Sequence, residues 1–320
     1  MTAQRAGLTD VVLRAMVMFP DSIQLHTAAF HTTVLLARPL GGREGMLFHS
    51  SMIRATGIFG SEDSSNGKSG IAVMLDSIRR FQENDELQAM ACWSLVNVAL
   101  APVQKAALVK LGGIQATANA MMRHPYSAEV QFRGLFALIN LVIPTVRLSN
   151  NETNQSNGQE QEIQEQLDEI NSTSEKVILD EVVGGVTELV VLAMKNFCSS
   201  EAILNRACLV LHNLSLSQDY HTTLLFTPNC YQMLEWCLAN YRTDQVLQQS
   251  ATGTLHRLQI TLSNDRELAR RFTESLRAQQ QLSLEQAHRE AIHLSEQQAA
   301  LHQNNSTAPG ADGPPPPRQA

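Results

Sequence analysis

Residues 108–142 read LVKLGGIQATANAMMRHPYSAEVQFRGLFALINLV, and this stretch decides the predicted fold. The first half is rich in apolar residues and begins with the pair Gly112 and Gly113, while Pro125 falls in a turn after it. The second half, 128–142, places apolar side chains at three- and four-residue steps, which is the spacing of one face of a helix: Val130, Gly134, Leu135, Leu138, Leu141 and Val142. The stretch therefore predicts two helices joined by a short turn.

The same pattern recurs along the chain. A segment 43 residues earlier carries the same Gly, Gln and Asn among matching apolar neighbours, at Gly70, Gln88 and Asn97. Two later copies follow. In the first, Gly184 aligns with Gly112 at an offset of 72, and the offset becomes 73 after a one-residue slip. The second copy is weaker and lies a further 44 residues along the chain. An N-terminal copy lies 105 residues before residues 120–127. We therefore predict about five units of roughly 43 residues.

Each unit is expected to contain three helices. Short apolar runs at 103–111 and 220–226 precede the longer pair and are expected to join successive units. Three helices in a repeat near 40 residues stack into an α-solenoid, in which each unit contacts only its neighbours. The predicted units span 7–59, 68–111, 112–148, 176–226 and 228–272.

Residues 108–142 resemble the armadillo consensus, in which a small apolar helix, Gly-Gly-Ile, a middle helix and a long helix ending Leu-x-Asn-Leu follow one another. The segment ACWSLVNVA at 91–99 is similar to the third helix of importin-α and β-catenin-like repeats. The resemblance covers about 7–272. It implies an all-α, right-handed α-solenoid that binds other proteins and has no catalytic activity.

Three segments depart from the repeat. Residues 149–175 are polar and acidic, so we expect a disordered insertion that cannot bury enough apolar surface to fold. Residues 274–303 favour a polar helix, either solvated or forming a short coiled coil, and 304–320 are expected to be a disordered Pro-rich tail. Gly7 aligns with Gly112, so the first unit lacks its leading helix, and the chain is either poorly capped or a fragment.

Composition argues against several classes of protein. The formal net charge is −7, of which −5 falls within 147–176 (two basic against seven acidic residues), and no Lys/Arg run is present, so nucleic-acid binding is not expected. The five cysteines lack CxxC spacing, and no apolar stretch approaches the ~18 residues of a membrane span. No signal region is visible at the N-terminus. We predict a cytoplasmic protein, with the nucleus left open, and no membrane association.

Catalytic motifs are also missing. Gly67, Lys68 and Ser69 look like the end of a phosphate-binding loop, but Glu62 stands where that loop needs a glycine. Metalloprotease, hydrolase and dinucleotide motifs are absent. Cys92, Leu135 and Cys208 share one position of the repeat, which indicates that the two thiols are core groups. We therefore predict no enzyme activity, no metal, no cofactor and no small-molecule substrate.

The predicted binding surface is a ladder of side chains on the third helices, which line the concave face of a solenoid. Asn recurs at one position of three units, and Trp or Phe precedes it by four residues in two of them. In importin-α, similar Trp-x-x-x-Asn pairs hold the backbone of an extended peptide. The candidate residues are Trp93, Asn97, Arg133, Phe136, Asn140, Arg206, Asn213 and Arg257.

Two interpretations stay open at the ladder. Each Asn can clamp a peptide backbone or bond locally within the repeat, and Trp93 can face the partner or pack in the core. Three arginines on or beside the ladder depart from an acidic importin-like groove and favour a partner with acidic character. The leading functional class is a protein-binding scaffold, and the alternative is a regulatory, non-catalytic region of an enzyme complex.

Overall fold

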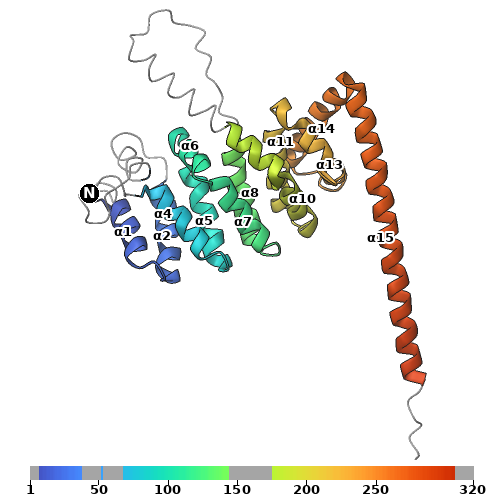
Figure 1. The fold of residues 1–320 in the computed structure, drawn as a ribbon, viewed down its shortest axis with the longest axis horizontal. Coiled ribbons are helices and arrows are strands. Elements are labelled where there is room, and N and C mark those ends of the chain that lie inside the picture. The colour runs from blue at the N-terminus through green and yellow to red at the C-terminus, as the bar shows by residue number, and fades with distance from the viewer. Residues whose placement is uncertain (1–6, 38–51, 53–67, 144–174, 307–320) are drawn as a thin grey trace, which may run out of the picture. The chain divides into compact units, whose positions relative to one another are not determined.

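A computed structural model describes residues 7–37, 52, 68–143 and 175–306 of the chain. These residues form helices and turns, and there is no strand among them (Figure 1). The predicted all-α class is therefore confirmed for this part of the chain. Most of the insertion and the end of the Pro-rich tail lie outside the described residues.

Five helix pairs make up most of the described residues before residue 265. The pairs are α1 (Leu8–Met18) with α2 (Ile23–Leu36), α4 (Gly70–Arg80) with α5 (Asp85–Val98), α7 (Gly113–Arg123) with α8 (Ala128–Val142), α10 (Thr187–Asn196) with α11 (Glu201–Leu214), and α13 (Cys230–Asn240) with α14 (Gln245–Asn264). Shorter elements precede some pairs: α6 (Pro102–Lys110), the helical residues 175–181, the π-helix η1 (Val182–Val186), the 3-10 helix η2 (Gln218–Tyr220) and α12 (His221–Phe226).

The second helix of each pair begins after a polar N-cap residue. Ser22, Asn84 and Asp244 each accept a hydrogen bond from the backbone N–H three residues later, at 3.3, 2.8 and 2.9 Å. Such side chains satisfy one of the backbone donors that a helix N-terminus leaves without an intrahelical partner. Ser127 and Ser200 occupy the same position in the two other pairs. The five N-caps lie 62, 43, 73 and 44 residues apart, which gives the register of the units.

Left-handed backbone marks the corner before four of the pairs. Gly7, Gly112, Gly185 and Asn229 have φ values of 68, 89, 120 and 63°. They lie 105, 73 and 44 residues apart, so Gly185 is the residue that corresponds to Gly112. The alignment of Gly184 with Gly112 at an offset of 72 is therefore wrong by one residue. Two adjacent glycines can both adopt φ above zero, and only the backbone shows which of them does.

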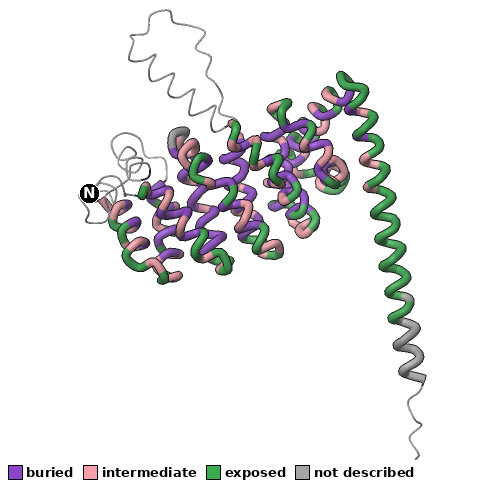
Figure 2. The backbone as a smooth tube through the Cα atoms, viewed as in Figure 1, coloured by how far each residue is buried: buried purple, intermediate pink, exposed green. Residues whose placement is uncertain are grey.

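The second helices of the pairs pack against one another in chain order. α2 contacts α5, α5 contacts α8, α8 contacts α11 and α11 contacts α14. Buried residues form a continuous band through these helices (Figure 2). One face of α5 is fully buried, and Cys92, Leu135 and Cys208 are at most 1% exposed, which confirms that this position belongs to the core.

The C-terminal part forms a unit of its own from Arg266 onward. A single helix, α15 (Arg266–Ser306), spans 41 residues, and its side chains between 280 and 294 are exposed. This helix includes residues 266–272, which the predicted last unit also covers, and 304–306, which the predicted tail also covers. No helix in the described ranges is both long and apolar enough to cross a bilayer.

Candidate functional site

The ladder consists of three positions on each of the second helices α5, α8, α11 and α14, lying 6, 9 and 13 residues after the N-cap. Most of these side chains are half-buried, whereas Met90, Ser250 and Asn213 are buried. The positions hold Met90, Trp93 and Asn97 on α5; Arg133, Phe136 and Asn140 on α8; Arg206, Leu209 and Asn213 on α11; and Ser250, Gly253 and Arg257 on α14.

Four ladder side chains from three helices form one continuous stack. The Trp93 and Phe136 ring centroids are 5.6 Å apart, with the rings tilted by 55°. The Arg133 guanidinium carbon lies 6.0 Å from the centroid of the Trp93 ring. The Arg206 guanidinium carbon lies 4.7 Å from the Phe136 centroid. The structure thus brings these expected site residues together, and Trp93 both packs on Phe136 and remains partly accessible.

The two stacked arginines differ in their polar partners. Arg133 forms an ion pair of 2.9 Å with Glu129, one turn earlier on α8, and donates a 2.7 Å hydrogen bond to the Met90 sulfur. Arg206 donates to the neighbouring Asn205 Oδ1 at 3.4 Å, and its Nε is buried without a hydrogen-bond partner. The charge of Arg133 is therefore neutralised locally, whereas that of Arg206 is not paired with a carboxylate of the described residues.

The three ladder asparagines also differ from one another. The amide nitrogen of Asn97 donates to the Trp93 carbonyl of its own helix at 2.8 Å. The amide nitrogen of Asn213 is buried and donates across to the Ile139 carbonyl of α8 at 3.3 Å. The amide nitrogen of Asn140 is buried with no partner. Asn213 thus has a structural role between two helices. The three asparagines share a ladder position but not a role.

The ladder on α14 is built differently. Arg257 Nη1 lies 3.3 Å from the Ser215 hydroxyl and 3.4 Å from His212 Nδ1. Burial and the nearby Arg257 charge lower the pKa of His212, so the ring is neutral near pH 7. A Cβ on Gly253 would lie 2.9 Å from the His212 ring. Glycine therefore leaves room for the imidazole where α5 and α8 carry aromatic rings.

Sequence reasoning missed a set of buried hydrogen bonds four residues after the N-caps. The Gln88 amide donates to the carbonyls of Ile78 and Phe81 at 2.9 and 3.0 Å. Gln131 and Gln248 make the equivalent pairs of bonds in their own units. The recurrence of Gln at an offset of 43 is the sequence feature that could have predicted these bonds. These bonds join the two helices of a pair by satisfying carbonyls at the end of the first one.

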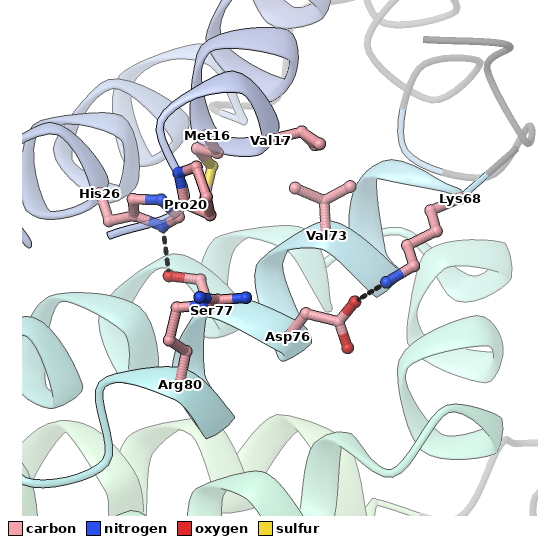
Figure 3. Close-up of a pocket in the computed structure, with 9 residues that line it drawn as sticks. All are labelled: Met16, Val17, Pro20, His26, Lys68, Val73, Asp76, Ser77 and Arg80. Atoms are coloured by element: carbon pink, nitrogen blue, oxygen red, sulfur yellow. Dashed lines mark hydrogen bonds and ion pairs between the residues drawn. The ribbon is translucent and has the colours of Figure 1, made fainter. Parts of the chain in front are cut away.

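His26 takes the place of this Gln in the first unit and borders a pocket. Its Nε2 lies 3.2 Å from the Phe19 carbonyl, and its Nδ1 lies 2.7 Å from the Ser77 hydroxyl of α4. The pocket, of about 260 Å³, lies between α1, α2 and α4 (Figure 3). Its charged groups are paired, Lys68 with Asp76 at 2.5 Å and Arg80 with Asp21 at 2.8 Å. The pocket therefore presents no unpaired charge to a ligand.

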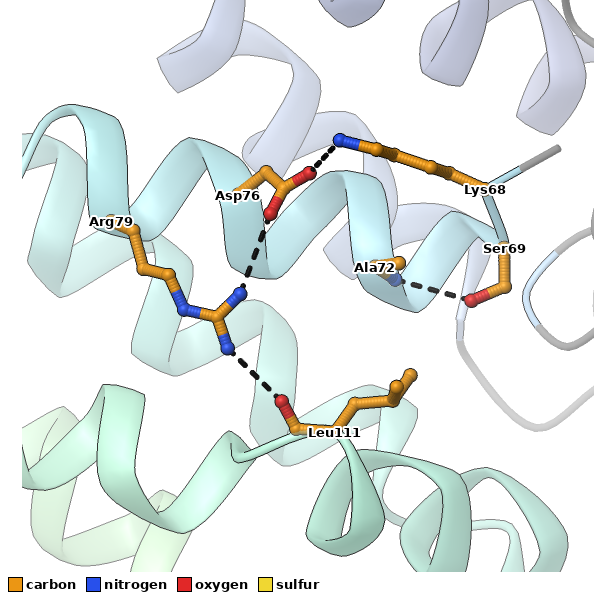
Figure 4. A network of polar contacts seen from close by, with 6 residues as sticks. All are labelled: Lys68, Ser69, Ala72, Asp76, Arg79 and Leu111. Carbon is orange, nitrogen blue, oxygen red and sulfur yellow. Dashed lines mark hydrogen bonds and ion pairs between the residues drawn. The ribbon is translucent and has the colours of Figure 1, made fainter. Parts of the chain in front are cut away.

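Asp76 also belongs to a polar network on the outside of α4 (Figure 4). It accepts from Lys68 and from Arg79, and Arg79 Nη2 donates to the Leu111 carbonyl at 3.0 Å. The network links α4 to the end of α6. All three charged side chains are more than 40% exposed, so their contribution to stability is small, on the order of 1 kcal/mol or less per pair.

Within the described ranges, no group of three or more His, Cys, Asp or Glu side chains is placed to hold a metal ion. Comparison with known proteins gives no match among protein-family models, among curated proteins or among solved structures.

Proposed function

We propose that this chain is a non-catalytic scaffold, built as a right-handed armadillo-type α-solenoid of about five units, that binds extended segments of other proteins. The partner lies along the ladder, which this proposal places on the concave face. Two features support the solenoid. The N-caps and the left-handed corners share one register, and the second helices pack in chain order.

The continuous stack on α5, α8 and α11 carries the binding proposal. Its rings and guanidinium groups offer a partly accessible strip that crosses three successive units. Trp, Tyr and Arg are the residue types that most often dominate binding energy at protein interfaces. Asn97 adds a carboxamide beside the Trp93 ring, and only one of its amide hydrogens is used by the Trp93 carbonyl.

Paired substitutions test the proposal. The double variant Trp93→Ala/Asn97→Ala removes two ladder groups but leaves the Asn213 bond between α8 and α11 in place. Met122→Ala/Tyr126→Ala is the matched control, because both side chains are at least 61% exposed and lie away from the ladder. Partners captured by the wild-type chain from its native cell are quantified by mass spectrometry, and circular dichroism verifies the fold of each variant.

We expect the ladder variant to lose its partners, with about 10-fold to 100-fold weaker binding for a directly contacting protein, which is typical of truncating a central aromatic residue. The control should retain them. Partners that survive the ladder substitution in a folded variant, or that are lost only from the control, would show that binding occurs elsewhere.

A further inference from the structure

We propose that Arg206 is the anchor for a single carboxylate side chain of the bound segment. This inference rests on the proposed function, and it assigns one residue and one ligand chemistry within the ladder. Arg133 and Arg206 share the first ladder position of their helices, whereas Arg257 occupies the third position of α14. The structure distinguishes all three by their contacts.

Two aromatic rings hold the Arg206 guanidinium in place. Its central carbon lies 4.7 Å from the Phe136 centroid and 5.4 Å from the Phe132 centroid. Both rings project from α8, four residues apart, and Arg206 belongs to the neighbouring helix α11. Cation–π contacts with two rings restrict the rotamers of the Arg206 side chain. A binding partner therefore meets a fork of donors that is already oriented.

Arg206 is also short of acceptors. Its Nε is buried with no hydrogen-bond partner, and its bond to Asn205 is 3.4 Å long. Asp244 is engaged by the Asn205 amide at 2.7 and 2.9 Å and by the Leu247 N–H at 2.9 Å. Because Nε is buried, a bound segment can reach only the terminal Nη1 and Nη2 groups. These two groups can still donate two parallel bonds to one carboxylate.

The other two arginines lack this combination. Arg133 is already paired with Glu129 and the Met90 sulfur. Arg257 lies against the Ser215 hydroxyl and the neutral His212 ring, and no aromatic ring of the described residues stacks on it. A single unpaired guanidinium matches the single charge of an Asp or Glu side chain. A phosphorylated residue carries nearly twice that charge and usually engages a cluster of arginines.

Three pools of fluorescent nine-residue peptides provide the probe. All are N-acetylated and C-amidated, with degenerate flanks free of acidic residues, and they carry Glu, Gln or phosphoserine at the centre. Fluorescence anisotropy measures their affinity for the wild-type chain. We expect the Glu pool to bind about 10-fold more tightly than the Gln pool, and at least as tightly as the phosphoserine pool.

Four variants localise the preference. Arg206→Met should remove the preference for Glu over Gln. Arg206→Lys keeps the charge but loses the forked pair of donors, so its preference for Glu over Gln should be less than about 3-fold. Arg133→Met and Arg257→Met should retain it. Circular dichroism confirms that each variant is folded, and Arg206→Lys keeps the test informative if the Met variant unfolds.

The outcomes separate this inference from the proposed function. If all pools bind wild type equally and lose affinity with Trp93→Ala/Asn97→Ala, the ladder binds peptides but Arg206 does not select a carboxylate. A Glu preference that persists in folded Arg206→Met, that disappears in Arg257→Met instead, or that is exceeded by the phosphoserine pool overturns the inference. If no pool binds wild type, the inference and the peptide-binding proposal both fail.

Discussion

Gln88 and Gln131 lie 43 residues apart in the chain and make the same two hydrogen bonds. Each amide donates to two carbonyls at the end of the preceding helix, at 2.9 and 3.0 Å for Gln88 and at 2.7 and 3.0 Å for Gln131. Both side chains are 1% exposed. A polar group in this position therefore replaces the water that the carbonyls would otherwise bind.

Replacing Gln131 with Leu should destabilise the fold. The carbonyls of Met121 and His124 would lose the Gln131 amide, and losing a buried partner of this kind costs about 1–3 kcal/mol. Urea unfolding followed by circular dichroism measures the change. Gln259→Leu, at an exposed position on α14, is the control and should lie within about 0.5 kcal/mol of wild type. Leu204 occupies the equivalent position of α11, so an unchanged stability for Gln131→Leu would show that the position tolerates an apolar residue generally.

Stability should fall as the pH is lowered from 7.5 to 5.5. Burial, and secondarily the Arg80 charge, lower the pKa of His26 below its ordinary 6.5, while nearby backbone carbonyls and Asp21 act in the opposite direction. The unfolded chain therefore binds a proton at a pH where the folded chain does not. The stabilisation is fully present above pH 6.5 and is lost as the pH falls toward the lowered folded pKa.

The variant His26→Gln tests this source of acid sensitivity. Glutamine is the residue found at this position in three other units and can keep a bond to the Phe19 carbonyl, so stability at pH 7.5 should change by about 1 kcal/mol or less. The slope of the unfolding free energy against pH should become shallower than in wild type. The control is Gln259→Leu, at an exposed position of α14 without an ionisable group, which should leave the slope unchanged. An equal slope in wild type and His26→Gln would assign the acid sensitivity to other groups, with His212 the next to test.

The two adjacent glycines of the third corner should respond differently to alanine. Gly185 has a φ of 120°, which an L side chain rarely adopts, so Gly185→Ala should cost about 1–2 kcal/mol. A Cβ on Gly184 would meet no atom within 4 Å, and Gly184→Ala should be neutral or slightly stabilising. Thermal unfolding of the two variants gives the comparison. The reverse order of stability would restore the alignment of Gly184 with Gly112.

Thiol labelling should find one reactive cysteine in the native chain. Cys198 is exposed, whereas the other four are buried. Burial raises the pKa of Cys92 and of Cys230 to about 12, which removes the reactive thiolate near pH 8. A chromogenic disulfide reagent should therefore modify one thiol quickly and all five only after denaturation. Cys198→Ser should abolish the fast reaction, and a remaining fast thiol would reveal local opening around α11 and α13.

The ladder shows what sequence periodicity can predict and what it cannot. The spacing placed Trp93, Phe136 and the two arginines at matching positions, and the structure brings these four side chains into contact. The same spacing treated the asparagines as equivalent, yet their amides have three different environments. Periodicity specifies which face of a helix a residue occupies. It does not specify which neighbouring atom satisfies a polar group on that face.

The pattern of residues was sufficient to predict the all-helical class, the positions of the helix pairs and the core position shared by Cys92, Leu135 and Cys208. These features follow from local propensity and from apolar spacing along one chain segment. Three features became visible only in the folded chain: which glycine turns the third corner, where α15 begins, and that Arg133 is neutralised while Arg206 is not. Those distinctions depend on backbone torsions and on atoms contributed by neighbouring helices, and a repeat pattern contains neither.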